Sequence, residues 1–290
     1  MAQPECQAGG HDWLAIWRQM YDDERAQAEA TPTPGFVAQP DCWAGQADRF
    51  AAAAQRGAQP DGFMRLLLPR LRQTDRVIDI GAGSGRYEPL LAAHAAEVLA
   101  IEPSPSMRGQ LERRLAEAPA TNVHISAASW PPDDLPICDV AIAAHVLYAV
   151  REIEPFLRCM YAAARRAGYL LLAFRHPSSF IGPFWERLHG ARRLPLPGAL
   201  ECLNALYQLG IAAHLTPVPI VNRFSYADER EALADLRWRL RVPAHLDYDR
   251  AIGAALHDLL DRTDDGRLAP RNQPEYAAVI WWEHPQHRAD

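Results

Sequence analysis

Lysine is absent from this 290-residue sequence, so its 30 lysine-plus-arginine positions are all arginine. Two explanations fit: a genome whose codon usage favours arginine and alanine, or a use for the forked guanidinium in binding acidic groups. A surplus of positive charge is also absent, since the formal net charge is −6. A nucleic-acid partner usually requires a basic face. We therefore expect no nucleic-acid partner.

Cysteine pairs and long apolar runs are missing as well. The cysteines are few, odd in number and scattered, without a CxxC pair: Cys6, Cys42, Cys138, Cys159 and Cys202. This pattern predicts free thiols in a reducing compartment and neither a zinc site nor a disulfide framework. No stretch approaches the roughly 20 apolar residues of a membrane span. The N-terminus lacks the basic start and apolar run of a signal peptide. The sequence thus predicts a cytoplasmic protein without a membrane partner.

Short apolar runs alternate with helical patterns in the middle of the chain. Five runs bounded by turn residues are predicted as strands: Arg76–Ile80, Glu97–Ile101, Asn122–Ser126, Cys138–Ala143 and Gly168–Phe174. The segments between them are predicted as helices: Tyr87–His94, Pro105–Ala116 and Ile153–Arg166. Alternation of this kind indicates an α/β fold, with a doubly wound, mostly parallel sheet covered on both faces.

The flanking regions are mainly helical. Residues 1–70 are predicted to form an N-terminal helical cap, and residues 71–290 the main domain. After the Pro-rich stretch Pro177–Gly198, the pattern predicts a helix, a strand, two amphipathic helices and a last strand: Ala199–Leu209, His214–Val221, Asp228–Arg241, Tyr248–Arg262 and Glu275–Trp282. The two helices, at about residues 226–265, resemble an insertion because they separate the last two strands.

A glycine-rich turn follows the first predicted strand. It reads Asp79-Ile80-Gly81-Ala82-Gly83-Ser84-Gly85-Arg86 and precedes a helix. Glycines allow a sharp turn and a close approach of a ligand to the backbone. The helix beyond offers unpaired N–H groups. This order of strand, turn and helix predicts a cofactor site.

The spacing of the turn discriminates between cofactors. Dinucleotide-binding folds use GxGxxG, in which a pyrophosphate rests on the helix N-terminus. Here the spacing is GxGxG, and Asp79 at the strand end would repel a diphosphate but suit a cationic ligand. The next strand ends at Glu102, whose carboxylate can accept hydrogen bonds from ribose hydroxyls.

In these residues the chain resembles the class I S-adenosylmethionine-dependent methyltransferases. The resemblance implies a seven-stranded sheet whose last strand, Glu275–Trp282, is antiparallel. It implies that Glu102, with Pro103 beside it, holds the ribose of S-adenosylmethionine. The methionine side of the cofactor would then lie against Asp79, Gly81, Gly83 and Gly85.

The resemblance is weaker after the third strand. Members of the family usually have an acidic or polar residue there that meets the adenine amino group, whereas this chain has no acid between Ser126 and Trp130. We therefore assign adenine recognition to the backbone near Ala128 and Ser129, with Trp130 packing on the base.

Four residues near the carboxyl ends of the fourth and fifth strands are candidates for the active site. Ligands of open α/β sheets bind beyond these strand ends. His145 could act as a general base, or it could hydrogen-bond the cofactor or a loop carbonyl. Tyr148 is expected to line the pocket. Arg175 and His176 would reach the same rim, where Arg175 could pair with a substrate carboxylate or with an acid of the protein itself.

The N-terminal segment Cys42–Phe50 resembles the part of the family that folds over the cofactor, which makes Trp43 a candidate contact. Together these features predict a methyltransferase acting on an oxygen or nitrogen of a small molecule, either as a monomer or as a homodimer. Two alternatives are a non-catalytic methyltransferase-like scaffold and an NAD(P)-dependent oxidoreductase. The GxGxG spacing argues against the second.

Overall fold

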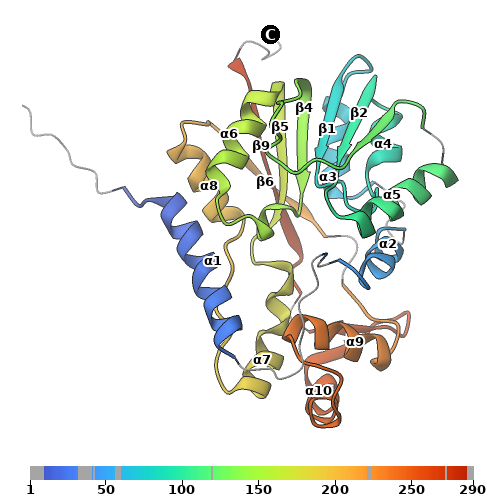
Figure 1. Cartoon of the computed structure of the whole chain (residues 1–290), viewed down its shortest axis with the longest axis vertical. Helices are drawn as coiled ribbons and strands as arrows, with labels where there is room; N and C mark the ends of the chain where they lie inside the picture. The colour runs from blue at the N-terminus through green and yellow to red at the C-terminus, as the bar shows by residue number, and fades with distance from the viewer. Residues whose placement is uncertain are drawn as a thin grey trace, which may run out of the picture.

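The structure, a computed structural model, describes residues 10–31, 41, 43–55, 60–118, 120–220, 224–271 and 273–285. Its centre is a seven-stranded sheet with strand order β3-β2-β1-β4-β5-β9-β6 (Figure 1). These strands are β1 (Arg76–Ile80), β2 (Glu97–Ile101), β3 (Val123–Ser126), β4 (Cys138–Ala144), β5 (Ala164–Ala173), β6 (His214–Pro219) and β9 (Tyr276–Glu283).

The first five strands are parallel, and β9 runs antiparallel to both of its neighbours, β5 and β6. The predicted mostly parallel sheet with an antiparallel last strand is therefore confirmed. Nine of the ten residues of β5 are buried, as expected for a strand covered on both faces. Gly168 in this strand allows β9 to approach closely, because a Cβ there would lie 2.1 Å from the Trp282 ring.

Helices cover both faces of the sheet. On one face Trp17, Phe156 and Leu206 pack against inward residues of β1, β4 and β5. The helices of this face are α1 (Trp13–Ala30), α6 (Ile153–Ala163) and α8 (Ala199–Gln208). On the other face lie α3 (Gly62–Leu67), α4 (Glu88–Ala92) and α5 (Pro105–Glu117). Two short 3-10 turns, η1 (Leu68–Arg70) and η2 (Leu147–Ala149), connect elements.

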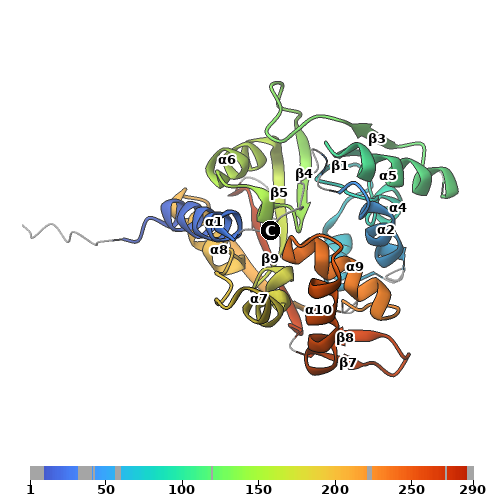
Figure 2. The same cartoon turned by 60° about the horizontal axis from the view of Figure 1, so that its bottom comes forward.

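A further cluster of elements covers the carboxyl ends of the parallel strands (Figure 2). It consists of η3 (Pro177–Ile181), α7 (Gly182–His189), α9 (Glu229–Leu240), α10 (Leu246–Leu259), β7 (Leu260–Arg262) and β8 (Leu268–Pro270). It has its own apolar core, in which Phe184, Trp185 and Leu236 are fully buried. The helices α9 and α10 lie in the chain between β6 and β9, where the insertion was predicted.

The N-terminal helices contact different parts of the molecule. Helix α1 packs against α8 and α6, and Trp17 donates its indole N–H to the carbonyl oxygen of Val150 at 2.9 Å. Helix α2 (Ala47–Gln55) contacts α5, and α3 contacts β6. None of the helices in the described parts of the chain is long and apolar enough to cross a bilayer.

Three local predictions differ from the structure. Helix α6 ends at Ala163 instead of Arg166, and β5 begins at Ala164. The Pro-rich stretch after Pro177 contains η3 and α7, and the hairpin of β7 and β8 was not predicted. Strand β6 ends at Pro219, while Val221, the predicted end, lies outside the described residues.

Candidate functional site

The glycine turn is held against the end of β2 by backbone hydrogen bonds. The N–H groups of Gly81 and Ala82 both donate to the carbonyl oxygen of Ile101, at 2.7 and 3.1 Å. Gly81, Gly83 and Gly85 all have positive φ angles, of 74°, 61° and 80°. L-residues with a side chain rarely adopt this region, so the conformation of the turn requires glycine.

The three glycines are needed for different reasons. A Cβ at Gly81 would lie 2.6 Å from Val146, and a Cβ at Gly85 would lie 2.7 Å from Leu111. Both glycines thus permit close packing inside the protein. A Cβ at Gly83 would meet only the carbonyl oxygen of Gly81, at 4.0 Å. The backbone of Gly83 therefore faces open space that a ligand can approach.

Three buried acids surround the turn. Asp79 is 2% exposed, Glu88 0% and Glu102 6%. Burial raises the pKa of the Asp79 carboxyl well above its ordinary value, and the negative charge of Glu88 adds to the shift. Burial also raises the pKa of Glu88 to about 7. Two carboxyl groups in contact share a proton because both cannot ionise side by side. A positively charged ligand would relieve this repulsion, whereas a diphosphate would increase it.

Glu102 connects the turn to the loop after β2. Its carboxylate accepts N–H bonds from Gly83 at 2.9 Å and from Ser104 at 2.8 Å. Burial raises the pKa of Glu102, although these two hydrogen bonds oppose the shift. A carboxylate has about four acceptor positions, so each oxygen keeps room for one more donor. Pro103, beside it, is exposed.

The segment containing Trp43 lies against the same loop. Asp41 accepts hydrogen bonds from the Ser104 hydroxyl at 3.0 Å and from the Ser106 N–H at 3.1 Å. The Trp43 ring lies 6.3 Å from the ring of Trp238 in α9. The segment thus spans from the loop after β2 to the insertion. Cys42 lies outside the described residues.

The residues predicted for the adenine follow β3. The Ala128 N–H donates to the Ser126 hydroxyl at 3.2 Å, and Ser129 is exposed. The Trp130 indole N–H donates to the carbonyl oxygen of Phe156 at 3.2 Å, with the two rings edge to face. The indole N–H therefore fixes Trp130 against α6. The Ala128 N–H is already hydrogen-bonded within the chain, to Ser126.

His145 begins the turn after β4 and has a positive φ of 61°. Its Nδ1 lies 3.1 Å from the Tyr148 hydroxyl, which accepts the Ala173 N–H at 2.6 Å. The hydroxyl can donate its hydrogen to His145 Nδ1, or accept a second bond from an Nδ1 that carries the proton, so the contact engages Nδ1 in either tautomer. His145 keeps an exposed surface, but desolvation by the surrounding protein lowers the pKa of its ring to about 4, with Arg86 adding to the shift.

His176, which follows β5, also has its Nδ1 engaged in a local hydrogen bond. Its Nδ1 accepts the Ser178 N–H at 3.0 Å and so caps η3. Its ring lies 4.7 Å from that of Tyr148. Burial lowers the pKa of His176 to about 3, with Arg239 adding to the shift. Both imidazoles are consequently neutral near pH 7.

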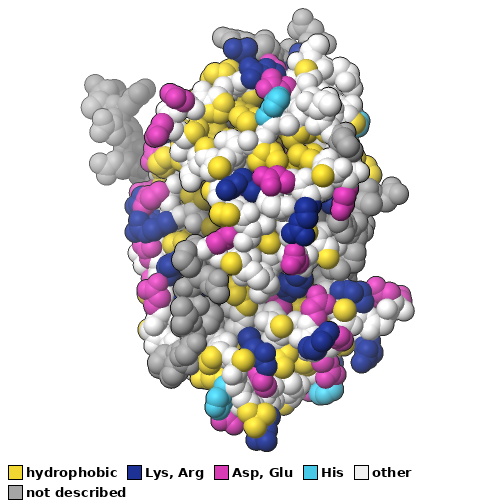
Figure 3. Space-filling view, turned by 45° about the vertical axis from the view of Figure 1, so that its right-hand side comes forward, with side chains coloured by type: hydrophobic (Ala, Val, Ile, Leu, Met, Phe, Trp, Pro, Cys, Tyr) yellow, Lys and Arg dark blue, Asp and Glu magenta, His cyan; other side chains and the backbone are white. Residues whose placement is uncertain are grey.

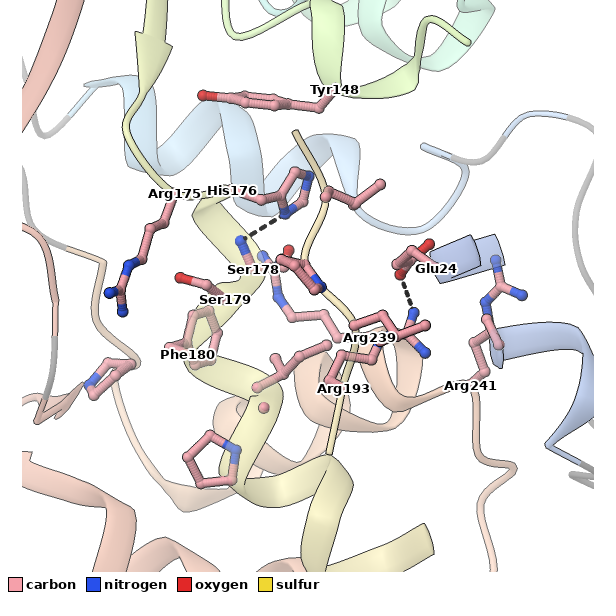
Figure 4. A pocket seen from close by; sticks show the side chains of 18 of the residues that line it. Glu24, Tyr148, Arg175, His176, Ser178, Ser179, Phe180, Arg193, Arg239 and Arg241 are labelled. Carbon is pink, nitrogen blue, oxygen red and sulfur yellow. Dashed lines mark hydrogen bonds and ion pairs between the residues drawn. The ribbon is translucent and has the colours of Figure 1, made fainter. Parts of the chain in front are cut away.

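A cavity of about 2490 Å³ opens beside these residues. Tyr148, Arg175 and His176 line it together with parts of α1, η3, α7 and α9. Figure 4 shows Tyr148 on one side and the Arg175 side chain extending toward Ser179 and Phe180. The structure thus brings three of the four predicted active-site residues to one cavity. The fourth, His145, contacts one of these three, Tyr148.

Two residues that support the site, Asp61 and Glu88, were not predicted from the sequence. Asp61, the N-cap of α3, accepts bonds from Arg86 at 2.7 Å and from the Tyr87 hydroxyl at 2.9 Å, which fixes the end of the glycine turn. An acidic residue before Gly-Phe-Met predicts a helix cap but not this contact. Glu88 reads in sequence as an ordinary acid in the first turn of a helix.

The comparisons with known proteins show the family of the chain. The family model described as "Methyltransferase domain" matches residues 48–258, which is more than half of the chain. The chain therefore belongs to this family. It is a class I S-adenosylmethionine-dependent methyltransferase domain, and its cofactor is S-adenosylmethionine. The oxidoreductase alternative is thereby removed.

Two curated relatives resemble a part of the chain. A probable dimethyladenosine transferase of Dictyostelium discoideum is 36% identical over 75 residues, which are 26% of this chain and 24% of the relative. Protein-L-isoaspartate O-methyltransferase 2 of Marinobacter nauticus is 36% identical over 78 residues, 26% of this chain and 35% of the relative. The matched part is thus about a third or less of either relative.

A solved structure, the YcgJ protein of Bacillus subtilis, superposes on the chain with a TM-score of 0.51 and 15% identity. The match covers 76% of this chain and 96% of that one. At this identity the similarity establishes the fold alone.

Proposed function

We propose that the protein transfers the methyl group of S-adenosylmethionine to an oxygen or nitrogen of a small molecule. The observation that carries this proposal is the cavity lined by Tyr148, Arg175 and His176, at the carboxyl ends of β4 and β5, on the same edge of the sheet as the glycine turn after β1. Ligands of open α/β sheets bind at this edge.

The residues around the turn fit the cofactor. The open space at Gly83 accepts a ligand against the backbone, and the buried pair of Asp79 and Glu88 favours the cationic methionine end. Glu102 keeps acceptor positions for the ribose hydroxyls. We assign the adenine to the loop of Ala128 and Ser129 next to Trp130, and a further contact to Trp43. When bound, the cofactor supplies a methyl group on an activated sulfonium.

The residues of the chain then contribute orientation and exclusion of water. Tyr148 joins the turn after β4 to the end of β5 through the Ala173 N–H, and so fixes the wall between cofactor and acceptor. His145 and His176 hold neutral rings whose Nδ1 atoms are already engaged, the first with the Tyr148 hydroxyl and the second with the Ser178 N–H. We infer that they shape the site and that neither removes a proton from the acceptor.

A small acceptor is favoured by the distribution of the surface charge. The cavity is lined by residues of η3, α7 and α9 and is open to solvent on part of its surface. On the face shown in Figure 3, arginines are interspersed with acids and form no continuous basic area. A site for RNA or DNA would gather positive charge on one face.

The proposal is tested by supplying methyl-labelled S-adenosylmethionine together with a small-metabolite extract, RNA or denatured protein in separate reactions. We expect label in the metabolite reaction and none in the other two. The Gly83→Val variant is the inactive control. Label in RNA or protein would contradict a small acceptor, and the absence of both cofactor binding and turnover would favour the scaffold alternative.

The neutral state of His145 gives a second prediction. Its pKa of about 4 lies below its ordinary value, so the ring stays deprotonated from neutral pH down to about pH 5. We expect His145→Ala to change kcat by less than ~3-fold. We also expect the pH profiles of kcat for the wild type and the variant to have the same shape between about pH 6 and 8. A loss of ~100-fold or more, the effect of removing a general base, would restore the catalytic alternative.

A further inference from the structure

The cavity contains more arginine than its acids neutralise. Among its lining residues Arg193 pairs with Glu24, and Arg25 pairs with Glu29 at 3.0 Å. Arg237, Arg239 and Arg271 pair with acids that lie outside the lining: Asp249, Asp235 and Asp261. The structure thus satisfies most of these guanidinium groups internally.

Three other lining arginines, Arg175, Arg192 and Arg241, make no side-chain ion pair or hydrogen bond with the described residues. Of these, Arg175 comes from the end of β5, two residues after Ala173, and its exposed side chain lines the cavity (Figure 4). The neighbouring polar side chain, Ser178, is already engaged, since its hydroxyl accepts a bond from Arg239 at 2.5 Å. A guanidinium presents a fork of donors that matches a carboxylate in two parallel bonds. This fork remains available at the wall that also carries His176 and Tyr148.

Aromatic side chains also line the cavity. Phe180 is one of them (Figure 4), and its ring packs 5.0 Å from that of Phe224 and 5.4 Å from the Arg239 guanidinium. Phe174, which precedes Arg175 in the chain, also lines the cavity. A ligand that places an anionic group on Arg175 therefore brings an adjoining apolar ring onto these side chains.

We propose that the methyl acceptor is an aromatic or similarly apolar carboxylate, whose carboxylate group is bound by Arg175. The proposal rests on the small-molecule methyl transfer argued above, and it assigns the acceptor to a chemical class. Arg175 acts here as an anchor that sets the position of the acceptor relative to the wall formed by Tyr148 and His176. An uncharged acceptor would leave the Arg175 guanidinium without a partner.

Binding of 2-naphthoate, measured by calorimetry on protein saturated with S-adenosylhomocysteine, tests this anchor without requiring turnover. The uncharged 2-naphthamide is the matched ligand control. We expect 2-naphthoate to bind at least ~10-fold more tightly than the amide, and Arg175→Gln to remove at least ~10-fold of that affinity. Arg241→Gln is the matched protein control, because Arg241 lines the same cavity on the side opposite Arg175 (Figure 4). It should leave the affinity within ~3-fold.

Equal binding of acid and amide, no binding of the acid, or a larger effect of Arg241→Gln would each overturn the assignment. Tighter binding of 2-naphthyl phosphate than of 2-naphthoate would show that Arg175 prefers a phosphate group. It would contradict the assignment of a carboxylate acceptor. Failure of methyl transfer itself shows separately, as the absence of label in the metabolite reaction described above. Turnover of uncharged acceptors alone would keep methyl transfer and remove the anchor.

Discussion

Gly83→Val should abolish measurable binding of S-adenosylhomocysteine, with a loss of affinity of at least ~100-fold. The Cβ position at Gly83 points into open space, since a Cβ there would lie 4.0 Å from the nearest atom beyond its chain neighbours, the Gly81 carbonyl oxygen. It would instead occupy the volume that we assign to the cofactor. The backbone N–H of Gly83 also donates to Glu102 at 2.9 Å, so a shift of this residue would move the proposed ribose ligand.

A matched control separates loss of the ligand cradle from backbone strain. Gly266 lies in the turn between β7 and β8, has a φ of 79°, and would also place its Cβ in open space. Gly266→Val therefore introduces a similar strain, on the order of 1–2 kcal/mol, far from the glycine turn. Calorimetry should show normal affinity in Gly266→Val and none in Gly83→Val. Equal affinity in both variants would mean that the cofactor binds elsewhere.

The central sheet and the glycine turn could be predicted from sequence because both depend on local patterns. Strands such as Arg76–Ile80 are short apolar runs between turn residues, and the positive φ angles of the turn coincide with its three glycines. The position of Glu102 at the end of β2 followed from the same alternation of strands and helices. These features need no knowledge of distant contacts.

The end of α6 shows where local patterns fail. Ala164–Arg166 reads as a continuation of the helix, yet it forms the first part of β5. Arg166 is 7% exposed there and pairs with the buried Asp75, which precedes β1. Pairing with β4 and β9, together with this distant ion pair, outweighs the helical preference of the segment.

The protonation state of the site residues could not be predicted for the same reason. The sequence placed His145 correctly at the end of β4 but left two roles open. The structure adds the Tyr148 hydroxyl on its Nδ1 and the Ala173 N–H on that hydroxyl, two contacts between separate strand ends. The identity of an acceptor likewise depends on cavity residues from α1, η3, α7 and α9, which are brought together only by folding.

Asp235→Asn should destabilise the protein by about 3–5 kcal/mol, because it removes the common partner of two buried arginines. The Asp235 side chain is 0% exposed and lies between Arg239, at 2.8 Å, and Arg49, with the Tyr226 hydroxyl donating to it at 2.6 Å. Arg49 belongs to α2 and Asp235 to α9. The substitution therefore leaves two buried guanidinium groups without a counter-charge and loosens the contact between the Trp43 segment and the insertion.

The pH dependence of the unfolding free energy tests whether the negative charge of Asp235 is the cause of the effect. Burial alone would raise the pKa of Asp235, but Arg239 and Arg49 outweigh it and hold the pKa below its ordinary value. A carboxyl group with a lowered pKa stabilises the fold above its unfolded-state pKa of about 4, and this contribution is lost as the pH falls through the folded-state value. The wild type should thus exceed Asp235→Asn in urea unfolding free energy at neutral pH, with the difference shrinking below about pH 4.

Asp258→Asn is the control for this measurement. Asp258 pairs with Arg187 at 2.8 Å, but its side chain is 61% exposed, so its removal should cost less than ~1 kcal/mol. A cost for Asp235→Asn that is no larger than this would show that Arg49 and Arg239 find other partners. A large loss of stability accompanied by weaker S-adenosylhomocysteine binding would instead link the position of the insertion to the cofactor site. The reason is that α2 and the residues before it contact both sides: Asp41 bonds to the loop after β2, and Arg49 pairs with α9.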